Sequence, residues 1–219
     1  MQSSPASNYH RNSNSSSNQT AMTQQPQPKH SNGTPVTWGS KKMSGTPQVV
    51  TPIEADLLRR SWSDEFDFLY DFGADIYTFV FEQDPSLRFL FPALVAAGDK
   101  YRETSAFRSQ ALKFVQVISY TIKNLNHEEQ RLKYLRKVGY AHVRLVERGF
   151  KPDHWVIAKK AIEHAINRRM SLGECPMIKP EESQAATRAW GKIAVHIVEI
   201  MHQGFIEGLK EAKEKHRIS

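Results

Sequence analysis

The stretch DFGADIYTFVFEQDP, residues 71–85, carries the pattern that decides the fold. Gly73 lies inside an apolar helical run, where a glycine costs about 1 kcal/mol relative to alanine. Such a glycine indicates that a second backbone crosses closely at this point. Tyr77 follows one turn later, so its hydroxyl either points into a cavity beside the crossing or bonds a carbonyl in the core. Pro85 ends the helix and opens a short turn over 85–90.

On both sides of this stretch, apolar residues recur every three or four positions and no strand-like alternation persists. This periodicity predicts an all-α fold. The first helix begins at Thr51, where Thr-Pro-x-Glu supplies an N-cap, a proline at the first helical position and a capping-box glutamate. The expected helices span 52–62, 64–83, 102–124, 129–148, 152–171 and 180–214, in addition to the short turn at 85–90.

Residues 1–48 differ from the rest of the chain in composition. They are rich in Ser, Asn, Gln and Pro, they contain no Asp or Glu, and they hold four of the chain's seven net positive charges. A segment this polar cannot bury enough apolar surface to order itself, so we predict a disordered tail before one folded domain at 49–219. The domain is then only mildly basic, and no nucleic-acid partner is expected.

The remaining bulk features favour a cytoplasmic protein. The N-terminus has no apolar segment typical of a secretion signal, and nowhere do about 18 apolar residues run together, so no membrane span is expected. Cys175 is the single cysteine, which excludes an internal disulfide and fits a reducing compartment. Oxidation could pair two chains through Cys175, but an ordinary loop thiol is the favoured interpretation, and the oligomeric state stays open.

Two polar residues lie on predicted core faces. His142 takes the place where the apolar series of the 129–148 block should continue. Gln110 lies at the edge of the apolar stripe in 102–124. Taken singly, each has a structural explanation, a core histidine bonded to the backbone or a rim glutamine that reaches water. Together with Tyr77 they outline a pocket with one metal-ligating side chain and two hydrogen-bond donors.

With these positions the sequence resembles the globin family over residues 51–214. Phe91 follows Pro85 by six residues, which matches the spacing of the globin C-helix proline and the phenylalanine that packs on the haem. Counting back without gaps puts Gly73 at a close helix crossing and Tyr77 at the distal position of the B helix. Further residues match the distal side of the E helix, the proximal ligand, and the tryptophans of the A and H helices: Gln110 with Phe114, His142, and Trp62 with Trp190.

The resemblance implies helices A to H packed around haem b, with His142 as the proximal iron ligand. A Tyr/Gln distal pair is similar to that of nematode globins and of bacterial flavohaemoglobins, and both side chains can donate hydrogen bonds to dioxygen or another diatomic ligand. Phe114 replaces the smaller aliphatic residue common at its position, so it is expected either to narrow the pocket or to push the ligand toward Tyr77. Lys113 is the expected haem-binding cation, with Arg144 and Arg148 as further candidates for the propionates; solvated surface cations are the alternative.

Reversible dioxygen binding, for storage, delivery or sensing, is the function that the resemblance favours, with no catalytic residue. A haem redox enzyme such as a nitric oxide dioxygenase is the alternative, and it requires a separate reductase because the chain has no dinucleotide-binding fingerprint. Haem-based signalling and a globin-like module without haem are also open. Glutamine is a poor iron ligand, so the sixth coordination position is expected to be open.

Overall fold

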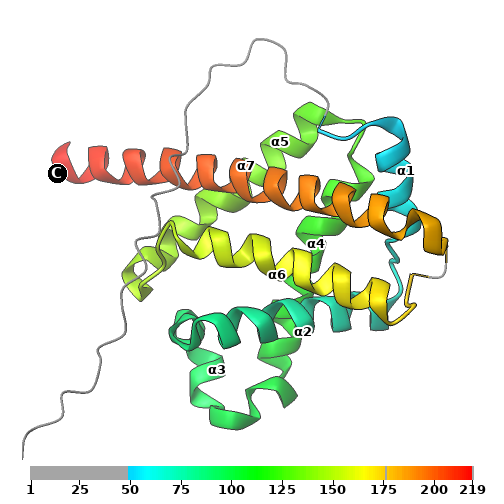
Figure 1. The fold of residues 1–219 in the computed structure, drawn as a ribbon. Helices are drawn as coiled ribbons and strands as arrows, with labels where there is room; N and C mark the ends of the chain where they lie inside the picture. Colours follow the sequence, from blue (N-terminus) through cyan, green and yellow to red (C-terminus); the bar gives the residue numbers. More distant parts are fainter. Residues whose placement is uncertain (1–48, 176, 219) are drawn as a thin grey trace, which may run out of the picture. The chain divides into compact units, whose positions relative to one another are not determined.

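The structure is a computed structural model that describes residues 49–175 and 177–218 (Figure 1). The predicted disordered tail at 1–48 lies outside the described residues. Every regular element within them is a helix, which confirms the all-α prediction. Among the described helices, none combines the length and the apolar character that crossing a bilayer requires.

Seven α-helices and four short 3-10 helices form the part of the chain that the structure describes. The α-helices are α1 (Pro52–Arg60), α2 (Phe66–Gln83), α3 (Pro92–Ala96), α4 (Ser105–Lys123), α5 (Glu128–Ala141), α6 (His154–Ser171) and α7 (Ser183–Ile218). The 3-10 helices are η1 (Pro85–Leu90), η2 (Gly98–Glu103), η3 (His142–Arg148) and η4 (Pro180–Glu182). Helix α7 packs along α5 and α6, and its C-terminal turns continue past α6 (Figure 1).

Helix α1 begins at the predicted capping box. The Thr51 backbone N–H donates to Glu54 Oε2 at 2.8 Å, and the Glu54 N–H donates to Thr51 Oγ1 at 3.2 Å. These bonds satisfy two amide groups that have no acceptor inside the helix. Pro52 occupies the first helical position, where its missing N–H costs nothing.

The predicted close crossing lies between α2 and α4. A Cβ atom at Gly73 would stand 2.5 Å from the backbone oxygen of Ala111, so any larger residue there must push α4 away. Tyr77 follows Gly73 by one turn, and Gln110 precedes Ala111 directly. The backbone contact therefore places these two polar side chains near each other.

The two tryptophans that match globin positions of the A and H helices connect the first and last helices of the described domain. The rings of Trp62 and Trp190 pack with centroids 5.6 Å apart, and Trp190 is fully buried. The Trp190 indole N–H donates to Ser61 Oγ at 2.8 Å, which satisfies its only polar atom. Phe72 of α2 packs against both rings, so α1, α2 and α7 share one core.

The predicted helix over 129–148 is wrong in its last part, residues 142–148, because α5 ends at Ala141 and η3 continues the chain. The cause lies at His142. Its ring Nδ1 donates to the Val138 carbonyl at 2.8 Å, while its backbone N–H bonds the carbonyls of Gly139 and Tyr140. The side chain thus takes the acceptor that the next α-helical backbone bond would use, and the backbone tightens into a 3-10 helix.

Helices α3 and η2, between η1 and α4, were missed by the sequence prediction. Both are too short to display an amphipathic repeat, so periodicity cannot detect them. The local signal for α3 is Pro92 at its first position. These short helices complete the segment between η1 and α4, which places Phe91 at the cavity.

Candidate functional site

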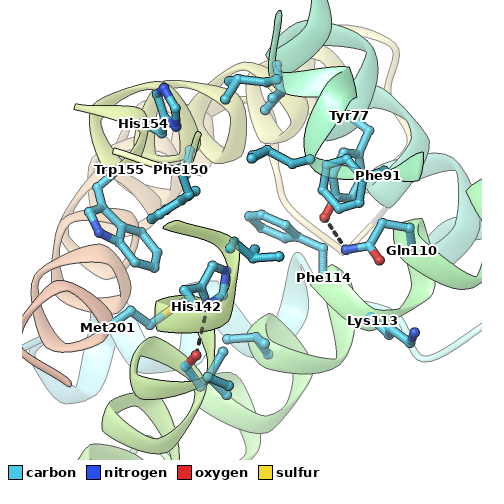
Figure 2. Close-up of a pocket in the computed structure, with 18 of the residues that line it drawn as sticks. Tyr77, Phe91, Gln110, Lys113, Phe114, His142, Phe150, His154, Trp155 and Met201 are labelled. Carbon is cyan, nitrogen blue, oxygen red and sulfur yellow. Dashed lines mark hydrogen bonds between the residues drawn. The ribbon is translucent and has the colours of Figure 1, made fainter. Parts of the chain in front are cut away.

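A cavity of about 810 Å³ lies between two walls of helices (Figure 2). One wall comes from α2, η1, α3 and α4, and the other from α5, η3, α6 and α7. Most of the described lining side chains are apolar, and none of them is Asp or Glu. Cavities of about 300–1,000 Å³ with few polar groups are typical of small-molecule and cofactor sites.

His142 stands at the junction of α5 and η3 and faces this cavity (Figure 2). Because Nδ1 donates to the Val138 carbonyl, Nε2 is the ring nitrogen left to accept or to ligate. Burial lowers the pKa of the imidazole, and the neighbouring Arg144 adds to this effect. A neutral ring with a fixed tautomer and an available lone pair is the form that binds a metal ion.

Two aromatic residues that the sequence analysis missed hold the His142 ring. The Phe150 and Trp155 rings lie 5.4 Å and 4.9 Å from it, centroid to centroid. Trp155 opens the first turn of α6 and is buried, whereas Phe150 follows the left-handed Gly149. Both residues line the cavity, but only the turn after η3 brings them to the histidine.

Tyr77 and Gln110 face the cavity from the opposite wall (Figure 2). The Gln110 amide Nε2 donates to the Tyr77 hydroxyl at 2.7 Å. Burial raises the pKa of Tyr77 to about 12, so the phenol keeps its proton at neutral pH. Since the hydroxyl oxygen accepts from Gln110, the hydroxyl hydrogen is available for another acceptor.

Phe91 and Phe114 support Tyr77 from two directions. Their rings meet the tyrosine edge-on, with centroid distances of 5.6 Å and 5.9 Å and interplanar angles near 90°. Such edge-to-face pairs are favourable and restrict the tilt of the ring. Both phenylalanines line the cavity.

Basic side chains reach the cavity at its exposed edge. Lys113, Lys137, Arg144 and Arg148 all line it and are exposed. Arg148 donates to the Leu90 carbonyl at 3.4 Å, which ties η3 to η1, and no bond of the other three to a described residue is found. This edge therefore suits a ligand that carries carboxylates.

All six residues that the sequence singled out as haem contacts lie at this one cavity: Tyr77, Phe91, Gln110, Lys113, Phe114 and His142. They come from both walls, with Tyr77 and Gln110 across from His142 (Figure 2). His154 also lines the cavity and was not singled out. Its Nδ1 accepts the Lys151 backbone N–H at 3.1 Å, and burial lowers its pKa.

No group of three or more His, Cys, Asp or Glu side chains with metal-binding geometry occurs among the described residues. Cys175 is buried, and its thiol donates to the Ser61 carbonyl at 3.6 Å. Pairing of two chains through Cys175 would require this buried contact to open.

The chemistry of the cavity lining fits haem. Its apolar interior would hold the macrocycle, the basic edge would pair with the two propionates, and Nε2 of His142 would supply a nitrogen ligand to the iron. Tyr77 and Gln110 provide polar groups on the opposite side. The described residues thus contain each type of group that a haem site needs.

Comparisons with known proteins point the same way. The chain is similar to the globin-related protein glb-13 of Caenorhabditis elegans, with 26% identity over 165 residues that cover 72% of this chain and 53% of that protein. The chain therefore spans about half the length of this relative. A crystal structure of a hexacoordinated haem protein from an anhydrobiotic tardigrade has the same fold, with a TM-score of 0.60, 20% identity, and coverage of 71% of this chain and 95% of that one.

The decisive comparison is with the family model for globins, which matches residues 74–201 and so covers more than half of the chain. The matched region contains Tyr77, Gln110 and His142, and most of both cavity walls. The chain belongs to the globin family.

Proposed function

We propose that this protein binds haem b in the cavity and uses it to bind dioxygen or another diatomic ligand reversibly. The observation that supports this most directly is the opposition of two groups across the cavity, His142 with its free Nε2 and Tyr77 with its free hydroxyl hydrogen. When bound, haem would supply an iron that can bind one protein ligand and one diatomic molecule.

His142 is the proposed iron ligand. Its hydrogen bond to Val138 fixes the tautomer and raises the basicity of Nε2, as second-shell acceptors do for metal-bound imidazoles. Phe150 and Trp155 exclude water from the ring and limit its rotation. Lys113, Lys137, Arg144 and Arg148 are the proposed partners of the propionates.

Tyr77 is the proposed direct donor to the diatomic ligand. Its hydroxyl has one hydrogen, and the bond from Gln110 leaves that hydrogen to point toward the ligand. Gln110 then acts partly through Tyr77, because it orients the hydroxyl, and its second amide hydrogen can reach the ligand as well. A hydrogen bond to a partly anionic ligand contributes on the order of 1.5–3 kcal/mol, which slows ligand release.

The sixth coordination position is proposed to be open in the ferrous protein. The tardigrade protein is described as hexacoordinated, but this chain has Gln110, an amide, on the wall that faces His142. The other cavity histidine, His154, has Nδ1 occupied by the Lys151 amide and lies near Phe150, away from Tyr77 (Figure 2). Neither side chain favours a second protein bond to iron.

The test is a haemin titration of the full chain, followed by its absorption spectrum. Wild-type protein should give a sharp Soret band at a one-to-one ratio. His142→Gly should lose most of that binding and recover it when imidazole is added, because imidazole fills the space of the missing ring. His164→Ala, an exposed histidine outside the cavity lining, is the control and should behave as wild type. Absence of a Soret band in the wild type would refute haem binding.

A second candidate function is a haem redox enzyme, such as a nitric oxide dioxygenase, with a separate reductase. The observation that favours it is the basic edge of the cavity, where four exposed cations exceed the charge of two propionates. Such an edge would attract an acidic electron donor, so reduction should slow as salt rises. Mixing the oxygenated protein with nitric oxide and following its re-reduction by cell extract at two salt concentrations tests this. If cell extract does not re-reduce the protein, the redox-enzyme function is refuted and reversible dioxygen binding is favoured.

A further inference from the structure

Helices α5 and α7 pass each other at closer range than side chains normally permit. A Cβ atom at Gly139 of α5 would overlap the backbone oxygen of Met201 of α7. A Cβ atom at Gly204 would likewise overlap the backbone oxygen of Arg136. Two glycines, one from each helix, therefore bring the two backbones into direct contact.

A third glycine extends this contact toward His142. A Cβ atom at Gly208 would stand 2.7 Å from Val143 Cγ2 and 2.9 Å from Tyr140 Cδ2. Val143 follows His142 directly, and Tyr140 precedes it by two residues. One turn further along α7, Glu211 accepts a hydrogen bond from the Tyr140 hydroxyl at 2.9 Å. The backbone on both sides of His142 thus rests on α7.

The same helix also supports the His142 ring. Phe205 of α7 is buried, and its ring lies 5.4 Å from Phe150 and 6.1 Å from Trp155, centroid to centroid. These are the two aromatic side chains that contact the imidazole. Residues 201–211 therefore support both the backbone and the ring of His142 indirectly, through the side chains that lie between them.

We propose that the segment of α7 between Met201 and Glu211 sets the position of His142 relative to the haem, with Gly204 and Gly208 as positioning residues. This rests on the proposed function, in which His142 ligates the iron. Small residues at these places keep α5 close to α7, so the His142 ring is held in one position and orientation, from which it would ligate the iron. A change at α7 should then alter ligand binding although α7 contributes only Met201 and neighbouring apolar side chains to the cavity.

Gly208→Ala tests the proposal. The added methyl meets the ends of the Val143 and Tyr140 side chains, which can shift, so the fold should survive. Gly191→Ala is the matched control, because it lies in the same helix and its nearest neighbour would be Glu163 Oε1 at 3.8 Å, an ordinary contact. The readouts are the iron–histidine stretching band of the ferrous protein by resonance Raman, the association rate of carbon monoxide, and the thermal unfolding midpoint.

Gly208→Ala should shift the iron–histidine band and change the association rate by roughly 2- to 30-fold, the range of couplings transmitted through packed elements. Gly191→Ala should leave both unchanged, even where its unfolding midpoint moves. If the folded Gly208→Ala protein has the wild-type band and rate, the inference about α7 is wrong, and the proposed function is unaffected. A wild-type protein without any iron–histidine band would instead refute the assignment of His142 as the ligand.

Discussion

The two walls of the cavity are built in different ways. In one wall, Tyr77 and Gln110 come from two uninterrupted helices, α2 and α4, which cross at Gly73, and the two side chains bond each other directly. The wall with His142 forms where α5 ends and η3 begins, and its histidine depends on α7 and on rings that follow η3. Tyr77 and Gln110 are thus positioned by the crossing of their own two helices, whereas His142 is positioned by residues of α7 and by the rings that pack around it.

This difference separates two properties of the protein. Retention of haem should depend mainly on the His142 wall, and release of the diatomic ligand mainly on the Tyr77 wall. The fixed crossing suits a hydrogen-bond donor that must stand at one distance from a small ligand. His142 is more open to adjustment, because its position also depends on side chains of α6 and α7 that pack around it.

The largest effect is expected when the crossing itself is broken. Gly73→Val should lower the free energy of unfolding by about 3 kcal/mol or more, because its side chain would collide with the α4 backbone at Ala111. Gly191→Val, whose Cβ has room, should change stability by less than about 1 kcal/mol. Urea unfolding of the two variants measures the contrast. Equal stabilities would mean that the α2–α4 contact is not tight.

Acid should act on the contact between α5 and α7, two of the helices that contribute to the His142 wall. His196 Nε2 of α7 accepts a hydrogen bond from Arg131 Nε of α5 at 3.2 Å, and burial beside this cation lowers the pKa of His196 to about 4. The unfolded chain takes up this proton near pH 6.5, so stability is full above that pH and falls as the pH drops toward 4. Partial exposure of His196 limits the loss to about 1–3 kcal/mol.

His196→Gln is the control for this acid effect. Glutamine can still accept from Arg131 but does not titrate, so the variant should lose less stability than wild type between pH 6.5 and 4. Urea unfolding across this range measures the difference between the variant and the wild type. The contributions of other histidines whose pKa is lowered are common to both proteins and cancel in this comparison. Parallel pH profiles would show that the Arg131 contact does not control the acid response.

The smallest effect is expected from Gln110→Leu. Loss of its amide leaves Tyr77 in the cavity but no longer oriented, so dioxygen release should accelerate by about 2- to 10-fold. In the Tyr77→Phe background the same change should add less, because the two side chains act through one hydrogen bond. Stopped-flow release rates for the two single variants and the double variant decide this. Fully additive effects would mean that Gln110 contacts the ligand independently of Tyr77.

The sequence was informative wherever a residue conflicted with its local pattern. Gly73 inside a helix predicted the close approach of a second backbone. His142 and Gln110 on apolar faces predicted polar groups at a buried site. Each of these signals lies within one or two turns of a recognisable helix. Helical periodicity also located six of the seven α-helices, because those runs are long enough to show their apolar face. The family resemblance then placed the isolated residues around one cavity.

Other features depend on contacts that no local pattern contains. The end of α5 is set by the bond between the His142 ring and Val138, so the continuous apolar pattern over 129–148 was misleading. Phe150 and Trp155 look like ordinary core aromatics until the turn after η3 brings them to His142. The role of Gly204 and Gly208 requires the path of α7 past α5. The glycines at positions 204 and 208, one helical turn apart, are the signal of this contact that the sequence contains.

The most direct test of the opposed His142 and Tyr77 groups is the rate of dioxygen release from the ferrous protein. Tyr77→Phe should release dioxygen about 10- to 100-fold faster than wild type while the haem spectrum is retained. Tyr70→Phe, on the same helix but outside the cavity lining, should release it at the wild-type rate. An unchanged rate in Tyr77→Phe, with haem bound, would contradict the account, because the hydroxyl would then not face the ligand.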